Sequence, residues 1–159
     1  MSLRARALPK DSSQQEIGGG THELYWARHN RGAMTTLDKP CLFCNPEREI
    51  LAANEGAVAV FDSFPVSPGH ALVLPRRHAA TIWDLDAEEF DHCFRLVLAV
   101  KPVLEARYSP DGFNVGVNCG VAAGQSVWHA HIHVIPRYKG DTPNPRGGVR
   151  HVIPLKANY

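Results

Sequence analysis

Several short segments of the chain alternate hydrophobic and polar residues, a pattern that predicts β-strands. The first two flank Asn54-Glu55-Gly56, a sequence that favours a hairpin turn. The last is a histidine-containing segment near the C-terminus. The predicted strands are residues 47–54, 56–62, 70–75, 112–118 and 127–134.

One long segment has helical periodicity instead. Asp86 is a good N-cap, and Glu89 three residues later completes a capping-box pattern. The apolar residues expected on one face of this helix are Phe90, Phe94, Val97 and Leu104. Pro102 is expected to kink the helix, or to end a first segment near Val100. Five strands and one long helix, with short helical segments, predict an α+β domain whose sheet is mostly antiparallel.

The pattern also divides the chain. Residues 1–39 are largely polar, contain the run Gly18-Gly19-Gly20 and show no sustained periodicity, so we expect a partly flexible N-terminal extension. Residues 40–159 form the expected domain, which ends in an irregular C-terminal tail.

Composition narrows the possible classes of protein. The chain has 159 residues, 44% of them hydrophobic and 21% charged, which is typical of one globular domain. A formal net charge of +1 gives no support to nucleic-acid binding or to a membrane-binding face. The polar N-terminus lacks the apolar core of a signal peptide. We therefore expect a cytoplasmic protein.

Three histidines occupy alternate positions of the last predicted strand: His129, His131 and His133. Because side chains at i, i+2 and i+4 share a face, the imidazoles line one face and the apolar residues between them line the other. A single histidine there is most often a satisfied structural residue, but three would each need a hydrogen-bond partner. The pattern favours a metal site of the H-x-H kind or a histidine nucleophile acting on an anionic substrate.

The residues before this strand help to choose between the two. The segment "NCGVAAGQSV" offers backbone N–H groups, an amide and a hydroxyl, and it has no carboxylate to complete a catalytic metal site. Such donors suit a phosphate group better than a metal ion. The residues concerned are Asn118, Gly120, Gly124, Gln125 and Ser126.

Cys41 and Cys44 form a C-x-x-C pair. A redox motif of this kind normally follows a strand and opens a helix in a βαβ unit, but Pro46 follows closely and no such unit is visible. The pair also suits half of a zinc site, because a zinc knuckle supplies two thiolates in this spacing. Two reduced cysteines packed as small apolar residues are a third interpretation.

The segment "HAHIHVI" resembles the signature of the histidine-triad (HIT) family. "GQSVWHAHIHVIPRY" resembles the C-terminal block of that family, and "FDSFPVSPGHALVLPRRH" resembles its N-terminal block. The similarity extends from about Cys41 to Tyr138. It implies a HIT-like fold that pairs with a second subunit, and an enzyme that hydrolyses or transfers nucleotidyl groups.

By this resemblance His131 is the nucleophile, which attacks the α-phosphorus and forms a covalent nucleotidyl-histidine that water then hydrolyses. An imidazole pKa of about 6.5 leaves a neutral, nucleophilic nitrogen at pH 7. The other residues implied in catalysis, at the phosphate and the leaving group, are His133, His70 and Ser126. The implied substrate contacts are Asp62 at the ribose, Asn118, Gln125 and Gly124 at the phosphates, and Leu42, Phe43 and Val60 at the base.

Some members of the family hold a structural zinc ion, and the resemblance places its ligands here at Cys41, Cys44, His78 and His129. The first histidine of the strand would therefore bind zinc while the second attacks the substrate. No catalytic metal is expected, although magnesium can bind the phosphates of the substrate. The resemblance also implies a homodimer.

The implied substrates are dinucleoside polyphosphates or related nucleoside phosphate derivatives. The alternatives are an adenosine phosphoramidate hydrolase and a nucleotide sensor with little turnover. An enzyme with a catalytic metal at the histidines is a further alternative. A zinc-based nucleic-acid-binding module is disfavoured by ligand spacing and charge.

Overall fold

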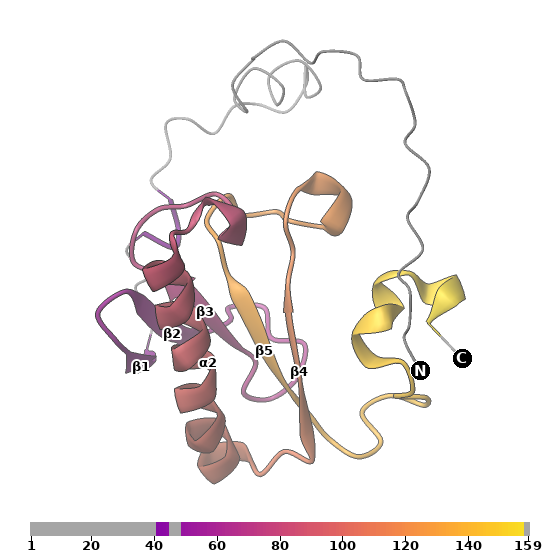
Figure 1. The fold of residues 1–159 in the computed structure, drawn as a ribbon. Helices are drawn as coiled ribbons and strands as arrows, with labels where there is room; N and C mark the ends of the chain where they lie inside the picture. The colour runs from indigo at the N-terminus through magenta and orange to yellow at the C-terminus, as the bar shows by residue number, and fades with distance from the viewer. Residues whose placement is uncertain (1–40, 45–48, 158–159) are drawn as a thin grey trace, which may run out of the picture. The chain divides into compact units, whose positions relative to one another are not determined.

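The computed structural model describes residues 41–44 and 49–157, so the predicted extension, residues 1–39, lies outside the described part of the chain. The strands are β1 (Ile50–Ala53), β2 (Ala57–Phe61), β3 (Ala71–Pro75), β4 (Gly112–Val117) and β5 (Ile132–Arg137). The helices are η1 (Ile82–Asp84), α2 (Ala87–Tyr108), η2 (Val121–Ala123), η3 (Gly148–Val152) and η4 (Pro154–Lys156). All are short 3-10 helices except α2 (Figure 1).

The strands form one five-stranded sheet in the order β1-β2-β3-β5-β4, with antiparallel neighbours throughout. This confirms the predicted fold class. The predicted hairpin turn joins β1 to β2, and there the Asn54 Oδ1 accepts hydrogen bonds from the backbone N–H groups of Gly56 and Ala57 at 3.1 and 2.8 Å. Because β5 lies between β3 and β4, it places residues 132–137 in the interior of the sheet.

The helix α2 begins as predicted. Asp86 accepts a hydrogen bond from the backbone N–H of Glu89, whose side chain accepts from the backbone N–H of Asp86. The helix continues through Pro102 to Tyr108, so it does not end near Val100. The predicted apolar face is right in part, because Leu104 is buried and Phe94 and Val97 pack against the core, but the other buried residues of the helix are Cys93, Leu96 and Val100. Phe90 is 38% exposed and stacks on Phe94, so this aromatic pair lies at the edge of the buried face.

The two faces of the sheet have different environments. One face packs against α2, and its core residues are Ala57, Ala59, Ala71, Val73, Ile132 and Val134. The other, which we call the site face, has a smaller apolar cluster of Phe43, Val58, Val60, Leu72 and Leu74. The alternation along each strand thus directs Ile132 and Val134 toward the helix, as expected, and His133 toward the site face.

The predicted histidine strand begins later than expected. β5 starts at Ile132, so only His133 lies within it, whereas His129 and His131 precede it. The segment that leads into β5 is nevertheless held to the core, because the backbone N–H of Ala130 donates to the carbonyl of Ala79 at 2.7 Å. We attribute the late start to this loop contact, which takes the hydrogen bond that a strand partner would otherwise supply.

The predicted irregular tail is a small structured unit, which we call the C-terminal lobe (residues 138–157). Arg150 donates to the backbone carbonyls of Lys156 and Ala157, and Ala157 is fully buried. Gly147 has φ +92°, and a Cβ there would lie 2.5 Å from the carbonyl oxygen of Ala157. Glycine is therefore required at this position. Within the described residues, no helix has both the length and the apolar character needed to cross a bilayer.

Candidate active site and metal centre

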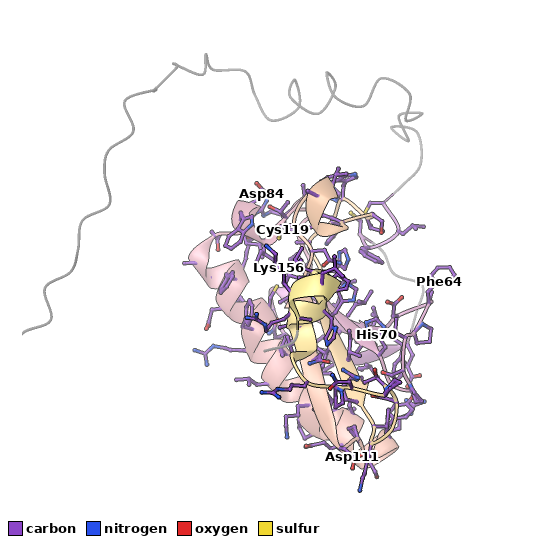
Figure 2. All side chains as sticks on the ribbon, turned by 90° about the vertical axis from the view of Figure 1, so that its right-hand side faces the viewer. Phe64, His70, Asp84, Asp111, Cys119 and Lys156 are labelled. Atoms are coloured by element: carbon purple, nitrogen blue, oxygen red, sulfur yellow. The ribbon has the colours of Figure 1, made fainter. Side chains whose placement is uncertain are left out.

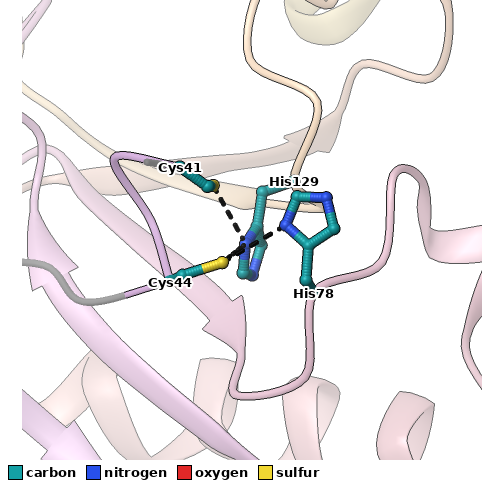
Figure 3. Close-up of side chains that lie close together, drawn as sticks. All are labelled: Cys41, Cys44, His78 and His129. Carbon is teal, nitrogen blue, oxygen red and sulfur yellow. Dashed lines mark hydrogen bonds between the residues drawn. The ribbon is translucent and has the colours of Figure 1, made fainter. Parts of the chain in front are cut away.

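Four side chains from three separate segments converge at the N-terminal approach to β5. They are Cys41, Cys44, His78 and His129, and all their ligand atoms lie within 4.8 Å of one another (Figure 3). His129 Nδ1 lies 3.5 Å from the sulfur of Cys41 and 3.7 Å from that of Cys44, and His78 Nδ1 lies 3.3 Å from Cys44. These separations match the edges of a tetrahedron with Zn–S and Zn–N bonds, about 3.5 Å.

The local structure orients these ligands. The fully buried His129 donates its Nε2–H to the carbonyl of Pro75 at 2.9 Å, so Nδ1 carries a lone pair toward the sulfurs. The backbone N–H of Phe43 donates to the sulfur of Cys41. Desolvation and neighbouring Cys41 raise the pKa of the Cys44 thiol, because two adjacent thiolates are unfavourable without a cation. Two cysteines and two imidazoles in this arrangement fit zinc better than a redox pair.

His131 is the next histidine along the chain and is only 6% exposed. Its Nδ1–H donates to the backbone carbonyl of His129 at 2.8 Å. This hydrogen bond fixes the tautomer, so Nε2 carries the free lone pair. The Phe43 ring contacts the imidazole edge-on, with centroids 5.3 Å apart. The arrangement presents one oriented nitrogen with an available lone pair on the site face.

His133 and His70 form a direct imidazole pair. His70 Nε2 and His133 Nδ1 are 3.0 Å apart. The ring centroids are 5.2 Å apart, close to this distance plus two ring radii, so the two nitrogens point at each other. A metal ion bound by both imidazoles would have to lie off the line that joins His70 Nε2 to His133 Nδ1. Although the ligand atoms of Asp62, His70 and His133 lie within 4.8 Å of one another, the geometry suits a hydrogen bond better than a catalytic metal.

The proton in this pair can be assigned from its surroundings. The backbone N–H of Val66 donates to His70 Nδ1 at 3.3 Å, so His70 carries its proton on Nε2 and donates it to His133 Nδ1. His133 then carries its own proton on Nε2, where it can donate to a phosphate. Burial, assisted by His131 and His70, lowers the pKa of His133 to about 4 and keeps it neutral. Burial lowers the pKa of His70. The Asp62 carboxylate lies 3.4 Å from His70 Nδ1 and partly opposes this lowering.

The glycine-rich loop before the triad is shaped by its backbone. Gly120 and Gly124 have φ of +86° and +84°, and a Cβ on either would meet no atom within 4 Å. The loop therefore leaves open space beside the Cα atoms of both glycines, while the N–H groups of Gly120 and Gly124 donate within the loop to Gln125 Oε1 and the carbonyl of Val121. Ser126 is exposed and Asn118 is partly exposed, as contacts for a ligand require. In Figure 2 this loop, marked by Cys119, lies at the end of the molecule opposite Asp111.

Gln125, which the resemblance implies as a phosphate contact, belongs to the same loop. It is 6% exposed, and its Oε1 accepts from the backbone N–H of Gly120 at 2.8 Å. Its Nε2 donates to the carbonyls of Ala80 and Val127 at 2.6 and 3.0 Å. The amide is thus engaged by the chain itself and holds the loop in shape. A sequence pattern cannot show this, because the partners are backbone groups.

The three residues predicted to form a base slot have unequal exposure. Leu42 is 69% exposed, Phe43 is 7% exposed and Val60 is fully buried. Only Leu42 offers a large apolar surface, while Phe43 supports the imidazoles and Val60 belongs to the core. Asp62 accepts a hydrogen bond from the backbone N–H of Phe64, which makes it a turn residue as well as a neighbour of His70.

Sequence reasoning missed Gly116. This glycine is paired with His133 across β4 and β5, and a Cβ there would meet no atom within 4 Å. A glycine inside a strand often marks a place where a ligand approaches the backbone. That signal was available in "GFNVGVN", but the register with His133 was not.

Alternating histidines beside a glycine-rich loop on an antiparallel sheet define a histidine-triad protein. The family model for the HIT domain matches residues 45–140, and the chain belongs to this family. An uncharacterized 16.1 kDa HIT-like protein of Mycoplasma pneumoniae is 38% identical over 104 residues, which cover 62% of this chain and 72% of that protein.

Two further relatives bear on chemistry. A bis(5'-adenosyl)-triphosphatase of Dictyostelium discoideum is 38% identical over 98 residues, covering 62% of this chain and 66% of that protein. The crystal structure of a zinc-bound histidine triad family protein from Mycobacterium smegmatis is 27% identical, with a TM-score of 0.59. That match covers 70% of this chain and 89% of the other.

Proposed function

We propose that this chain is a nucleotidyl hydrolase that cleaves nucleoside phosphate derivatives at the α-phosphate. The observation that carries the proposal is the His131 imidazole, whose Nδ1–H is fixed on the carbonyl of His129 while Nε2 faces the site with a free lone pair. Nucleophilic catalysis needs a buried imidazole that is held in one orientation and has a nitrogen lone pair available.

The proposed reaction has two steps. In the first, His131 Nε2 forms a bond to the α-phosphorus, the bond from phosphorus to the leaving oxygen breaks, and the leaving group takes a proton from the site or solvent. In the second, water attacks the same phosphorus and loses a proton to solvent, the P–N bond breaks and its electron pair returns to Nε2. His133 Nε2–H holds a phosphate oxygen throughout, and His70 keeps His133 in the required tautomer.

The remaining site residues are assigned to binding. Asn118, Gly124 and Ser126 contact the phosphates and the leaving group, Asp62 contacts the ribose, and Leu42 with the edge of Phe43 contacts the base. Gln125 supports the site by holding the loop in shape, and Val60 supports it by packing in the core. No step requires a catalytic metal, and magnesium has a place only on the phosphates of the substrate.

Dinucleoside polyphosphates are the proposed substrates, which agrees with the activity named for the Dictyostelium relative. An adenosine phosphoramidate hydrolase and a nucleotide-binding sensor are the competing functions. A screen of diadenosine polyphosphates, adenosine phosphoramidate and adenylyl-lysine for release of AMP separates the three. Fast release from the polyphosphates supports our proposal, and binding without release from any compound favours the sensor.

The cluster of Cys41, Cys44, His78 and His129 is proposed to hold a structural zinc ion. Support comes from the tetrahedral separations and from the zinc-bound relative. The ion would tie the segment around Cys41 to the approach to β5 and hold the carbonyl of His129 where His131 needs it. We also propose a location in the cytoplasm, where cysteines stay reduced and available to bind a metal.

Replacing Ser126 by Ala should lower kcat/KM about 10–1000-fold, the range for losing one transition-state donor. The hydroxyl is exposed beside the open space of the loop, so its loss should not affect folding. Steady-state kinetics on a diadenosine polyphosphate measure the effect, with Ser109→Ala, at the end of α2, as the matched control. Unchanged kinetics in Ser126→Ala would remove the hydroxyl from the mechanism.

We also propose a homodimer formed through β4 and α2. Within the described residues β4 is an edge strand, and α2 packs mainly over β1, β2 and β3. The helix-side Val115 of β4 and Leu98 of α2 are 40% and 73% exposed. An unpaired edge with apolar neighbours suits a partner subunit.

Light scattering should report a dimer for the wild-type chain at micromolar concentration and mainly monomer for Val115→Lys. The control variant Val121→Lys should remain a dimer. A monomeric wild-type chain would contradict the proposed homodimer.

A further inference from the structure

The site face continues beyond the triad. Past His133, β5 runs through Ile135 to Arg137, and a hollow of about 250 Å³ lies over this part of the sheet. Its lining residues are Val66, Ser67, Asn114, Ile135, Arg137 and Asp141. The hollow is smaller than the ~300–1,000 Å³ that holds a whole drug-sized ligand, and is suited to one ring system. Its lining residues come from the loop after β2, the strands β4 and β5 and the C-terminal lobe.

The distance from the nucleophile restricts what can reach this hollow. Ile135 lies four residues along the chain from His131, about 13 Å at the rise of a strand. A small leaving group bonded to the α-phosphorus does not span that length, whereas a polyphosphate chain does. Gly116, opposite His133, adds no side chain to this part of the site face, and a Cβ there would meet no atom within 4 Å.

The charges of the hollow are already paired. Arg137 donates through Nε and a terminal nitrogen to both oxygens of Asp141 at 2.7 Å, and its other terminal nitrogen donates to Asn114 Oδ1. A terminal phosphate therefore finds no uncompensated cation there. The three hydrogen bonds hold the guanidinium as a rigid plane, and such a plane stacks well on aromatic rings.

The other lining groups complete a surface for a flat heterocycle. Val66 and Ile135 supply apolar contacts. The Ser67 hydroxyl donates to the carbonyl of Pro136 at 2.6 Å, so its oxygen can still accept a hydrogen bond. Asn114 uses its Oδ1 on Arg137, which leaves the amide Nδ2–H group to donate at the rim. Such groups recognise the polar edge of a nucleobase without adding charge.

We propose that this hollow is a subsite for the base of the leaving nucleotide, which makes the enzyme selective for substrates with a nucleoside at both ends. The inference rests on the proposed function, since it concerns the leaving group of that reaction. It gives Val66, Ile135 and Arg137 a role in specificity that is separate from the chemistry at His131.

The test compares diadenosine tetraphosphate with adenosine 5'-tetraphosphate. Attack at the α-phosphorus releases ATP from the first and inorganic triphosphate from the second, so the two leaving groups differ by one nucleoside. The wild-type ratio of kcat/KM should be at least about 10, the effect expected for stacking one base. Val66→Trp fills the hollow and should bring the ratio close to 1. Val152→Trp is the control, because Val152 is similarly exposed (77% against 73%) and lies outside the lining.

A second measurement separates this inference from the proposed function. Calorimetry on His131→Asn compares binding of the two compounds without turnover. Tighter binding of the dinucleoside, lost in the double variant with Val66→Trp, supports the subsite even if neither compound is hydrolysed. Equal kcat/KM for both compounds in the wild type, or a ratio unchanged by Val66→Trp, would overturn the subsite while leaving the nucleotidyl hydrolase intact.

Discussion

Replacing His131 by Asn is expected to lower the turnover number roughly 10⁴–10⁶-fold, the range for removing a covalent nucleophile. The variant cannot form the P–N bond, so the two-step path is closed. Because asparagine is smaller than histidine and also polar, the site should keep most of its shape. Nucleotide binding should therefore change far less than turnover, because the phosphate and ribose contacts remain.

Steady-state kinetics give the loss of turnover, and calorimetry with a non-hydrolysable substrate analogue gives the binding. His92→Asn is a matched control, since His92 lies on α2, away from the site face, where it pairs with Glu88. It should retain activity within about twofold, as surface changes usually do. Near-normal turnover in His131→Asn would mean that the nucleophile is wrongly assigned.

The second large effect concerns the metal centre. The purified protein should contain about one zinc ion per chain, and Cys41→Ser should lose it. A site filled at about 1,000 times its Kd stabilises the fold by about 4 kcal/mol, so the free energy of unfolding should fall by roughly that amount. Activity should fall as well, because His129 supplies both a zinc ligand and the carbonyl that orients His131.

Elemental analysis and urea unfolding measure these two quantities. Cys119→Ser is the control: Cys119 is also a partly exposed free cysteine, but it is not one of the four clustered residues. It should keep its zinc and its stability. Metal-free wild-type protein that is as stable as the zinc-loaded form would show that the cluster is not a structural metal site.

Much of the fold could be predicted because its signals are local. The alternation of residues located the strands, and Asp86 with Glu89 located the start of α2. The exact face of the helix was harder, since Cys93 and Leu96 are buried while the bulkier Phe90 remains at the edge. That choice depends on how α2 lies across β2 and β3, which no local pattern encodes.

The candidate site was predicted in its residues but not in its contacts. Spacing alone indicated the Cys41/Cys44 pair and the triad, whereas the addition of His78 and His129 to the pair came from the resemblance to the family. The contacts of Gln125 and Val60 were not predictable, because Gln125 donates to the carbonyl of Ala80, 45 residues away, and Val60 is buried by the packing of the sheet. The His70–His133 pair likewise depends on the register between β3 and β5.

The central claim is that His131 carries a covalent nucleotidyl group. Its most direct test is rapid quenching of the enzyme with a labelled adenylyl substrate, followed by peptide mapping of the modified side chain. We predict that the label appears within the first turnover, that it is attached to Nε2 of His131, and that it disappears as AMP is released. Label on another residue, or AMP formation in a single turnover with no labelled protein at any time, would contradict the account.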